Sequence, residues 1–423
     1  MTTFLCKIDS KFTCVLLIIF SILLALGTWN PFLPAVDIEN ENSGFSLAQI
    51  YSAIFITYLF FIRLFNFRQL KFTSWGKYIV LFYITLLLST VYWSINELSI
   101  STAVFFLKFF LSISLCFLLP EIFIRNKKYL YYSLAAFSFA CGFVALLFSI
   151  GAVDEFTYIS KGRVFIFGEN PNSTSGRITI AFLLLLYLIF KNPLKWRRRR
   201  FWFCLLFFPM LMMIIASGSR GSFLILCIGI IAFLLLNPSV SNVKKYVILI
   251  CSVIAIGISI SFIVSRHSEF SLFSRLGNSL EYGETGGRER LNSYSLQIFE
   301  ENPLVGKGTI GYSKEMSSKF NESRTVHNLY IYVLVTSGIV GFILFMFFML
   351  TLLFKSIQIR RYDYLPLIVF GFIFLLAYKT GGVLTYLLMW YLFAVIISLI
   401  DLELYERQNY NIVDGVESDK VGQ

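Results

Sequence analysis

The chain has 423 residues, of which 57% are hydrophobic and only 14% are charged. So few charged side chains cannot cover the surface of a soluble fold of this length. The composition therefore excludes a water-soluble globular protein and indicates an integral membrane protein. The formal net charge of +12 is then expected to reflect how the chain is oriented in a bilayer.

Apolar stretches that are long enough, or nearly long enough, to cross a hydrocarbon core of about 30 Å recur along almost the whole chain. Their apolarity is continuous, whereas the strands of a membrane barrel would alternate, so they predict helices. We therefore expect an all-α polytopic membrane protein with about 12 transmembrane helices. The predicted spans are 12–27, 47–65, 76–93, 98–119, 129–150, 177–190, 201–216, 221–236, 245–264, 328–354, 363–378 and 382–400.

Basic residues gather in alternate connections between these spans. By the positive-inside rule those connections face the cytoplasm, which places both termini there. The basic run at 196–200 is explained by anionic lipid headgroups. Nucleic acid is not expected as a partner, because no aromatic-bearing domain accompanies this run. The basic residues of these connections include Lys7, Lys11, Arg63, Arg68, Lys71, Lys77, Arg125, Lys127, Lys128, Lys191, Lys195, Lys244, Lys245, Lys355, Arg360 and Arg361.

The connection between the ninth and tenth spans differs from the others. Both histidines and eight basic residues lie between Ser265 and His327, so we expect the chemistry to involve this outer loop. The predicted parts are transmembrane helices 1 to 9 (1–264), the outer loop with short helices (265–327), transmembrane helices 10 to 12 (328–400) and a cytoplasmic tail (401–423). The acidic composition of the tail predicts disorder.

Metal and disulfide chemistry are not expected. All seven cysteines lie in or beside apolar spans, and the two histidines are 60 residues apart. Neither arrangement has the spacing of a metal site, and the outer connections contain no cysteine to pair.

Polar groups gather in four outer segments, 168–172, 217–222, 286–290 and 324–328. Arg220 lies in a short turn whose glycines and serines leave backbone N–H groups open to an anion, although an arginine there can also simply reach the membrane interface. Arg288 follows two glycines and opens a predicted surface helix. It could fork to a phosphate, or it could be a solvated charge paired with Glu284 or Glu289. Arg290 is its substitute.

His327 immediately precedes the tenth span, where the positive end of a helix favours a neutral imidazole that can accept a proton. A capping or packing histidine is the alternative. Along a regular helix, Gly338 lies almost in line with His327 and Gly341 about 40° away, which predicts close approach by another helix or a lipid tail. Lys108, in mid-span, is either functional or held by a buried hydrogen bond, and Lys379 could reach the interface.

These groups suit one class of reaction. No nucleotide is supplied outside the inner membrane, so a transferase there needs a donor that arrives activated and anchored in the bilayer. Arginines would hold its diphosphate, and a neutral histidine would take the proton from an attacking hydroxyl. Such a mechanism requires neither metal nor cofactor.

The order and spacing of several motifs resemble the O-antigen ligase family of Gram-negative bacteria. The motifs are Ser219-Arg220-Gly221, then Arg288 with Pro303 and Gly306-Lys307-Gly308, then His327-Asn328 with Gly338 and Gly341. Asn170-Pro171-Asn172 is similar to a motif of the wider ligase and polymerase superfamily. Asn292 departs from the pattern, because a large aromatic residue is expected there.

The resemblance implies a bundle like that of C-type membrane glycosyltransferases, with a periplasmic loop subdomain, in the bacterial inner membrane. It implies metal-independent, inverting transfer of O-antigen from undecaprenyl diphosphate to a sugar hydroxyl of lipid A–core, which completes lipopolysaccharide. Arg220, Arg288 and His327 are then the catalytic residues. Further substrate-binding candidates are Asn170, Asn172, Arg290, Asn328 and Lys108.

Two other functions compete with the ligase. An O-antigen polymerase of the same superfamily would use a second lipid-linked glycan as acceptor, and the motifs separate the two poorly. A transporter of lipid-linked glycan is the non-enzymatic alternative, but the chain shows no internal duplication of the kind that transporters carry.

Overall fold

The computed structural model describes residues 2–27, 45–65, 74–94, 100–160, 163–166, 169–191, 193–195, 200–237, 241–266, 287–379 and 383–421. Most of these residues are helical. The helices are α1 (Thr2–Leu26), α2 (Leu47–Phe65), α3 (Ser74–Ser94), α4 (Ile100–Arg125), α5 (Lys127–Ser149), α6 (Pro171–Lys191), α7 (Arg200–Leu205), α8 (Phe207–Ala216), α9 (Arg220–Leu236), α10 (Asn242–Arg266), α12 (Arg288–Glu301), α13 (Gly308–Phe320), α14 (Leu329–Ile359), α15 (Leu365–Lys379) and α16 (Leu387–Val421).

Two short 3₁₀ helices and one hairpin complete the fold. The 3₁₀ helices are η1 (Asp154–Phe156) and η2 (Val383–Thr385). Strands β1 (Thr157–Ser160) and β2 (Arg163–Ile166) pair antiparallel, with Thr157 opposite Ile166 and Ser160 opposite Arg163. The hairpin leads directly into the segment before α6, so it fixes where that helix begins.

The predicted helical class is confirmed. Every predicted span coincides with helix, although the span 201–216 is divided into α7 and α8. Among the described residues, six helices are long and apolar enough to cross a membrane, in α3, α4, α5, α6, α14 and α16, and six shorter apolar helices accompany them. The number of twelve crossings stays a prediction.

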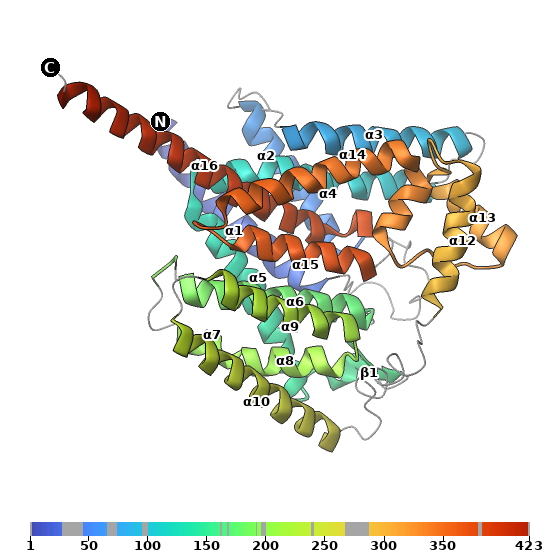
Figure 1. Cartoon of the computed structure of the whole chain (residues 1–423), viewed down its shortest axis with the longest axis horizontal. Helices are drawn as coiled ribbons and strands as arrows, with labels where there is room; N and C mark the ends of the chain where they lie inside the picture. The colour runs from blue at the N-terminus through green and yellow to red at the C-terminus, as the bar shows by residue number, and fades with distance from the viewer. Residues whose placement is uncertain are drawn as a thin grey trace.

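The helices run broadly along one axis, with α12, α13 and β1 at one end and both chain termini at the other (Figure 1). Helices α16 and α6 are the most central, because 83% and 78% of the residues in their most apolar stretches are buried by the rest of the protein. The corresponding share in α3 is 39%. Both termini at one end fit the predicted topology. Which end faces the cytoplasm stays a prediction.

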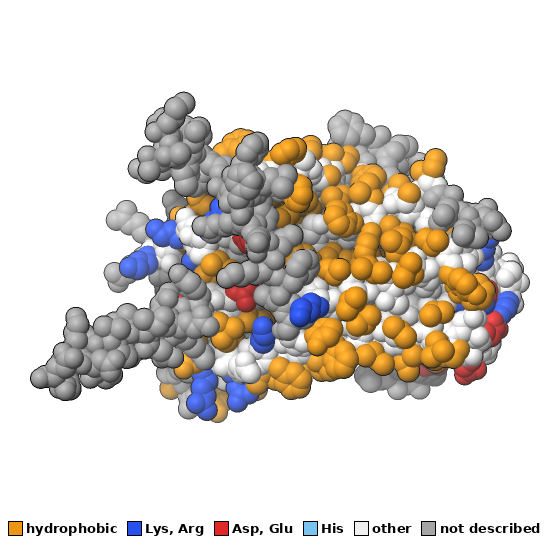
Figure 2. Space-filling view, turned by 90° about the horizontal axis from the view of Figure 1, so that it is seen from above, with side chains coloured by type: hydrophobic (Ala, Val, Ile, Leu, Met, Phe, Trp, Pro, Cys, Tyr) orange, Lys and Arg blue, Asp and Glu red, His pale blue; other side chains and the backbone are white. Residues whose placement is uncertain are grey.

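On the face shown in Figure 2, hydrophobic side chains predominate from the middle to the right, and most Lys, Arg, Asp and Glu side chains lie on the left or at the right-hand end. On α10, Ile250, Val253 and Ile258 are more than half exposed. A soluble protein would bury a continuous face of this kind, so its exposure is expected only if lipid covers it.

The C-terminal tail differs from its prediction. Instead of an irregular segment after Asp401, helix α16 continues to Val421. Two physical reasons favour helix at its start: Leu, Glu and Arg residues there have good helix propensity, and Glu406 pairs with Lys127 at 2.9 Å.

Candidate functional site

The turn between α8 and α9 presents Arg220 as the first residue of a helix. Gly218 adopts a left-handed conformation (φ 63°) that a residue with a β-carbon rarely takes. Ser219 then caps α9, its hydroxyl accepting the backbone N–H of Ser222. The cap fixes the direction in which the helix leaves the turn, and hence where the guanidinium of Arg220 starts.

Arg163 of β2 joins this turn to the start of α6. Its Nε donates to the carbonyl of Ser217 at 3.2 Å, and its second guanidinium nitrogen donates to Oδ1 of Asn172 at 2.7 Å. Asn170 Oδ1 accepts the backbone N–H of Asn172 at 2.9 Å, immediately before Pro171 opens α6. The structure therefore brings the predicted asparagines beside the Arg220 turn, with their oxygens in local bonds; substrate contact stays a prediction.

A buried ion pair between Glu169 and Arg177 holds the segment before α6 against that helix. Both terminal guanidinium nitrogens of Arg177 donate to the carboxylate of Glu169, one of them at 2.7 Å. The hydroxyl of Thr174 donates to the same carboxylate at 2.8 Å. Both charged side chains are about 95% buried, so removing either one would strand a charge in the bundle. Residue 168, which belongs to the predicted segment, lies outside the described residues.

Lys379 brings α15 to the start of α9. Its side chain lies on Gly221, with Nζ 2.8 Å from the position that a β-carbon of Gly221 would occupy. Arg220 and Arg288 are both close enough to act on this ammonium group electrostatically. Three cations from α9, α12 and α15 therefore share one end of the bundle.

Arg288, and not its substitute Arg290, belongs to this cluster. Arg288 is the first residue of α12, after Gly287 (φ 79°). Arg290 is exposed and pairs with Glu322 at 3.3 Å. Arg324 also forks to Glu322, at 2.8 and 2.7 Å, and these arginine contacts lower the pKa of Glu322 to about 2. The carboxylate of Glu322 therefore holds Arg290 and Arg324.

His327 is within electrostatic reach of Arg288. Burial lowers the pKa of its imidazole, and the positive charges of Arg288 and Arg324 lower it further. These effects support the prediction of a neutral imidazole. The cause is burial and the charge of two arginines, whereas the prediction rested on the positive end of a helix. Asn328 is the residue that caps α14, accepting the backbone N–H groups of Tyr330 and Ile331. A substrate contact by Asn328 stays a prediction beside this capping role.

Tyr312 holds the backbone before His327, a role that the sequence did not reveal. Ser295 Oγ donates to the carbonyl of Leu291, so the Tyr312 hydroxyl donates to Ser295 at 2.9 Å and accepts the N–H of Val326 at 2.9 Å. Burial raises the pKa of Tyr312, which keeps it in this donating form. One phenol therefore joins α12, α13 and the residue before His327.

Residues 205–346 match the family model described as O-antigen ligase. This segment is therefore similar to the O-antigen ligase family, and residues 205–346 are called the O-antigen ligase domain below. It extends from the end of α7 into α14 and contains Arg220, Arg288 and His327, so the resemblance seen in the sequence is confirmed. The family indicates a membrane glycosyltransferase-type enzyme. No curated protein matches the chain.

Within the segment that matches the family model, α14 is broken at Gly338, which has φ 65° and ψ −171°. The segment after α12 enters this break. The carbonyls of Pro303 and Leu304 accept the N–H groups of Ile339 and Val340, and Lys307 N–H donates to the carbonyl of Val335 at 2.9 Å. The loop thus replaces helical hydrogen bonds that the break removes.

The break corrects the expectation of a regular glycine stripe below His327. His327 precedes the helix and Gly338 is not helical, so a constant rotation per residue does not relate them. The predicted close approach does occur at Gly338, where a β-carbon would collide with the carbonyl of Leu304. The neighbour at Gly338 is a loop of the matched segment. At Gly341 a β-carbon would first meet the side chain of Ser337 in α14 itself, with Phe82 of α3 farther away at 3.6 Å.

Helix α3 fixes the inserted loop from the other side. Trp93 Nε1 donates to the carbonyl of Gly306 at 2.8 Å, and the ammonium of Lys307 lies 4.1 Å from the centroid of the Trp93 ring. Ser89 donates to the carbonyl of Thr336 at 3.1 Å. The motif Gly306-Lys307-Gly308 is therefore held by α3 and α14. Because it follows the end of α12 closely in the chain, it helps to position α12, which begins at Arg288.

Lys108 has an aromatic neighbour in the structure. It is buried in α4, with its ammonium 5.2 Å from the centroid of the Phe45 ring. Its predicted substrate contact stays a prediction. Asn292, the departure from the family pattern, lies one turn after Arg288. Its buried side-chain oxygen has no hydrogen-bond partner among the residues that the structure describes.

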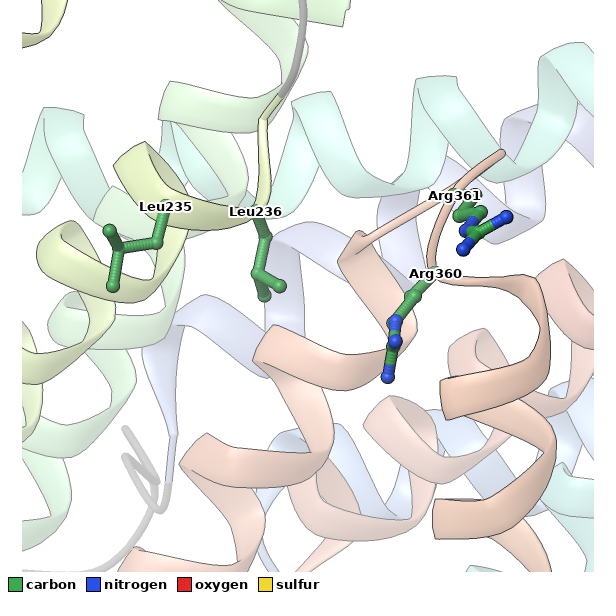
Figure 3. Close-up of a pocket in the computed structure, with 4 residues that line it drawn as sticks. All are labelled: Leu235, Leu236, Arg360 and Arg361. Carbon is green, nitrogen blue, oxygen red and sulfur yellow. The ribbon is translucent and has the colours of Figure 1, made fainter.

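The pocket in Figure 3 is separate from this cluster. It has a volume of about 320 Å³ and is lined by Leu235 and Leu236 at the end of α9 and by Arg360 and Arg361 after α14. Arg220 and Arg288 lie at the opposite end of the bundle, because the seventeen residues of α9 separate Arg220 from this pocket by about 25 Å. In the described ranges, no group of three His, Cys, Asp or Glu side chains is placed to hold a metal ion.

Proposed function

We propose that this protein transfers O-antigen glycan from undecaprenyl diphosphate to a sugar hydroxyl of lipid A–core in the periplasmic leaflet of the bacterial inner membrane. One observation carries the proposal. Within the matched segment, Arg288 opens α12 within electrostatic reach of His327, which precedes α14, and of Lys379, whose ammonium lies against Gly221 next to Arg220. A proton acceptor therefore lies beside a group of cations suited to a diphosphate.

The proposed step is a direct displacement. The acceptor hydroxyl oxygen forms a bond to the anomeric carbon while the bond from that carbon to the diphosphate oxygen breaks. The bonding electrons leave on the diphosphate, whose growing charge Arg220 and Arg288 stabilise. His327 takes the hydroxyl proton. Attack opposite the leaving group inverts the anomeric centre, and no metal is needed. Asn170, Asn172, Arg290, Asn328 and Lys108 remain candidates for sugar and headgroup contacts.

Reconstitution in liposomes separates this function from its rivals. Purified protein, lipid-linked O-antigen and lipid A–core are combined with EDTA, and products are resolved by mass and gel mobility. We expect glycan joined to lipid A–core and release of undecaprenyl diphosphate. Longer glycan on undecaprenyl diphosphate would identify a polymerase, and movement of donor across the bilayer without joining would identify a transporter. Loss of ligation in EDTA that Mg²⁺ restores would contradict the metal-free step.

The pH dependence of kcat/KM reports the state of His327. A base must be unprotonated, so the rate should fall as pH drops through its pKa. Because burial and two arginines lower that pKa, we expect the midpoint of the fall to lie below the ordinary histidine value of about 6.5. An acid limb centred above that value would contradict the environment that the structure gives this ring.

Arg324→Gln gives the matched test of this assignment. It removes one cation that disfavours the imidazolium, so the midpoint should move to higher pH while the plateau rate changes little. The Arg324 side chain is half exposed, so salt should shrink the shift. If the acid limb does not move, another group titrates.

A further inference from the structure

The side chain of Lys379 lies against the start of a neighbouring helix. This lysine is the last residue of α15, and its side chain extends across the first turn of α9. Its Cδ and Nζ lie 2.5 and 2.8 Å from where a β-carbon of Gly221 would stand. The missing side chain at 221 is what allows the ammonium to approach the residue next to Arg220.

Among the described residues, the charges that act most strongly on Lys379 are both positive. Arg220 and Arg288 are its charged neighbours, and none of the ion pairs within the described ranges includes it. Lys379 therefore adds a third positive charge, on a compact group, to the place where Arg220 and Arg288 meet. An anionic ligand there would be attracted by all three side chains.

We infer that Lys379 is a third ligand of the donor diphosphate, contributed by α15, next to Arg220 and Arg288. The inference rests on the proposed function and extends it beyond the O-antigen ligase domain, which ends at residue 346. The three groups differ usefully in shape. Two planar guanidinium groups fork to separate oxygens, while a compact ammonium with three donors fits the space between them. Lys379 would then help to stabilise the charge on the leaving diphosphate.

Binding of undecaprenyl diphosphate to the purified full-length protein in detergent tests this directly. Lys379→Met keeps the length of the side chain and removes its charge. We expect it to weaken binding about tenfold, as the loss of one charge-assisted contact would. Lys319→Met is the matched control: Lys319 pairs with Glu301 and Glu315 on α12 and α13, and binding should be unchanged.

A second variant keeps the positive charge of Lys379 but displaces its ammonium group from Gly221. Gly221→Ala would place a methyl group against the flexible end of Lys379, without backbone strain in the α9 helix. It should weaken binding in the same direction. Combined with Lys379→Met it should add nothing further, because both changes remove one contact. Strict additivity of the two changes would show that Gly221 and Lys379 act separately, which would overturn the inference.

Two further measurements separate the sources of the anion. Lipid A–core also carries phosphate, so its binding is measured with the same variants. A loss confined to lipid A–core, or an unchanged affinity for undecaprenyl diphosphate in Lys379→Met, would overturn the inference. If the wild type ligates and this variant binds normally, only the inference fails. If the wild type neither binds undecaprenyl diphosphate nor ligates, the proposed function fails.

Discussion

His327→Ala is expected to reduce ligation by about 10²- to 10⁴-fold, which is the range for loss of a general base. The acceptor hydroxyl is then left without a group to take its proton as the new bond forms. Rates are measured with purified protein and both lipid substrates. The protein should remain folded, because Tyr312 holds the preceding residue through the backbone N–H of Val326 rather than through the imidazole.

Two controls show whether the loss is chemical. Free imidazole added to His327→Ala should restore part of the rate, as a diffusible base can enter the vacated volume, whereas a packing defect would not respond. His267→Ala, at the only other histidine, should leave the rate unchanged. Full ligation by His327→Ala would eliminate this residue as the base.

Gly338→Ala is expected to have the largest effect on the fold of the site. With φ 65° and ψ −171°, Gly338 occupies a backbone region essentially restricted to glycine, and a residue with a β-carbon is disfavoured there by about 1–3 kcal/mol. That β-carbon would also collide with the backbone carbonyl of Leu304, which cannot give way as a side chain could. The segment Pro303–Lys307 must then leave the break in α14. We expect a lower melting temperature in detergent and loss of ligation.

Gly371→Ala is the matched control, because Gly371 lies in α15 with no atom near the added methyl group and no positive φ. It should retain both stability and activity, and alanine can even favour the helix there. Were Gly338→Ala as stable and as active as Gly371→Ala, the inserted loop would not position Arg288, and its contacts with α14 would be incidental to the site.

The fold class follows from local chemistry, which explains why apolar stretches predict it well. Lipid offers no hydrogen bonds, so a continuous apolar run has to satisfy its own backbone as helix. Ser219 at the start of α9 follows equally local rules of capping. The tail after Asp401 was predicted to be irregular, but its helix continues a central one, and Glu406 near the start of the tail pairs with Lys127.

The candidate site was predictable only in part. Arg220, Arg288 and His327 stand out because charged residues are rare beside apolar spans and because their motifs resemble a family. The interpretation of Lys379 as an interface lysine had no means of including Gly221, which is 158 positions away in the chain. The choice between Arg288 and Arg290 was open for the same reason, since Glu322 decides it.

Composition and apolar spacing alone indicated a helical membrane protein, an unusually polar segment before the tenth span and the residues from which a site can be built. Which of those residues meet was decided by the tertiary structure, through the Lys379 contact with Gly221, the Tyr312 bond to Val326 and the loop inserted at Gly338. The physical reason is range. Propensity, capping and burial act over a few neighbouring residues, whereas each of these contacts depends on how separate helices pack.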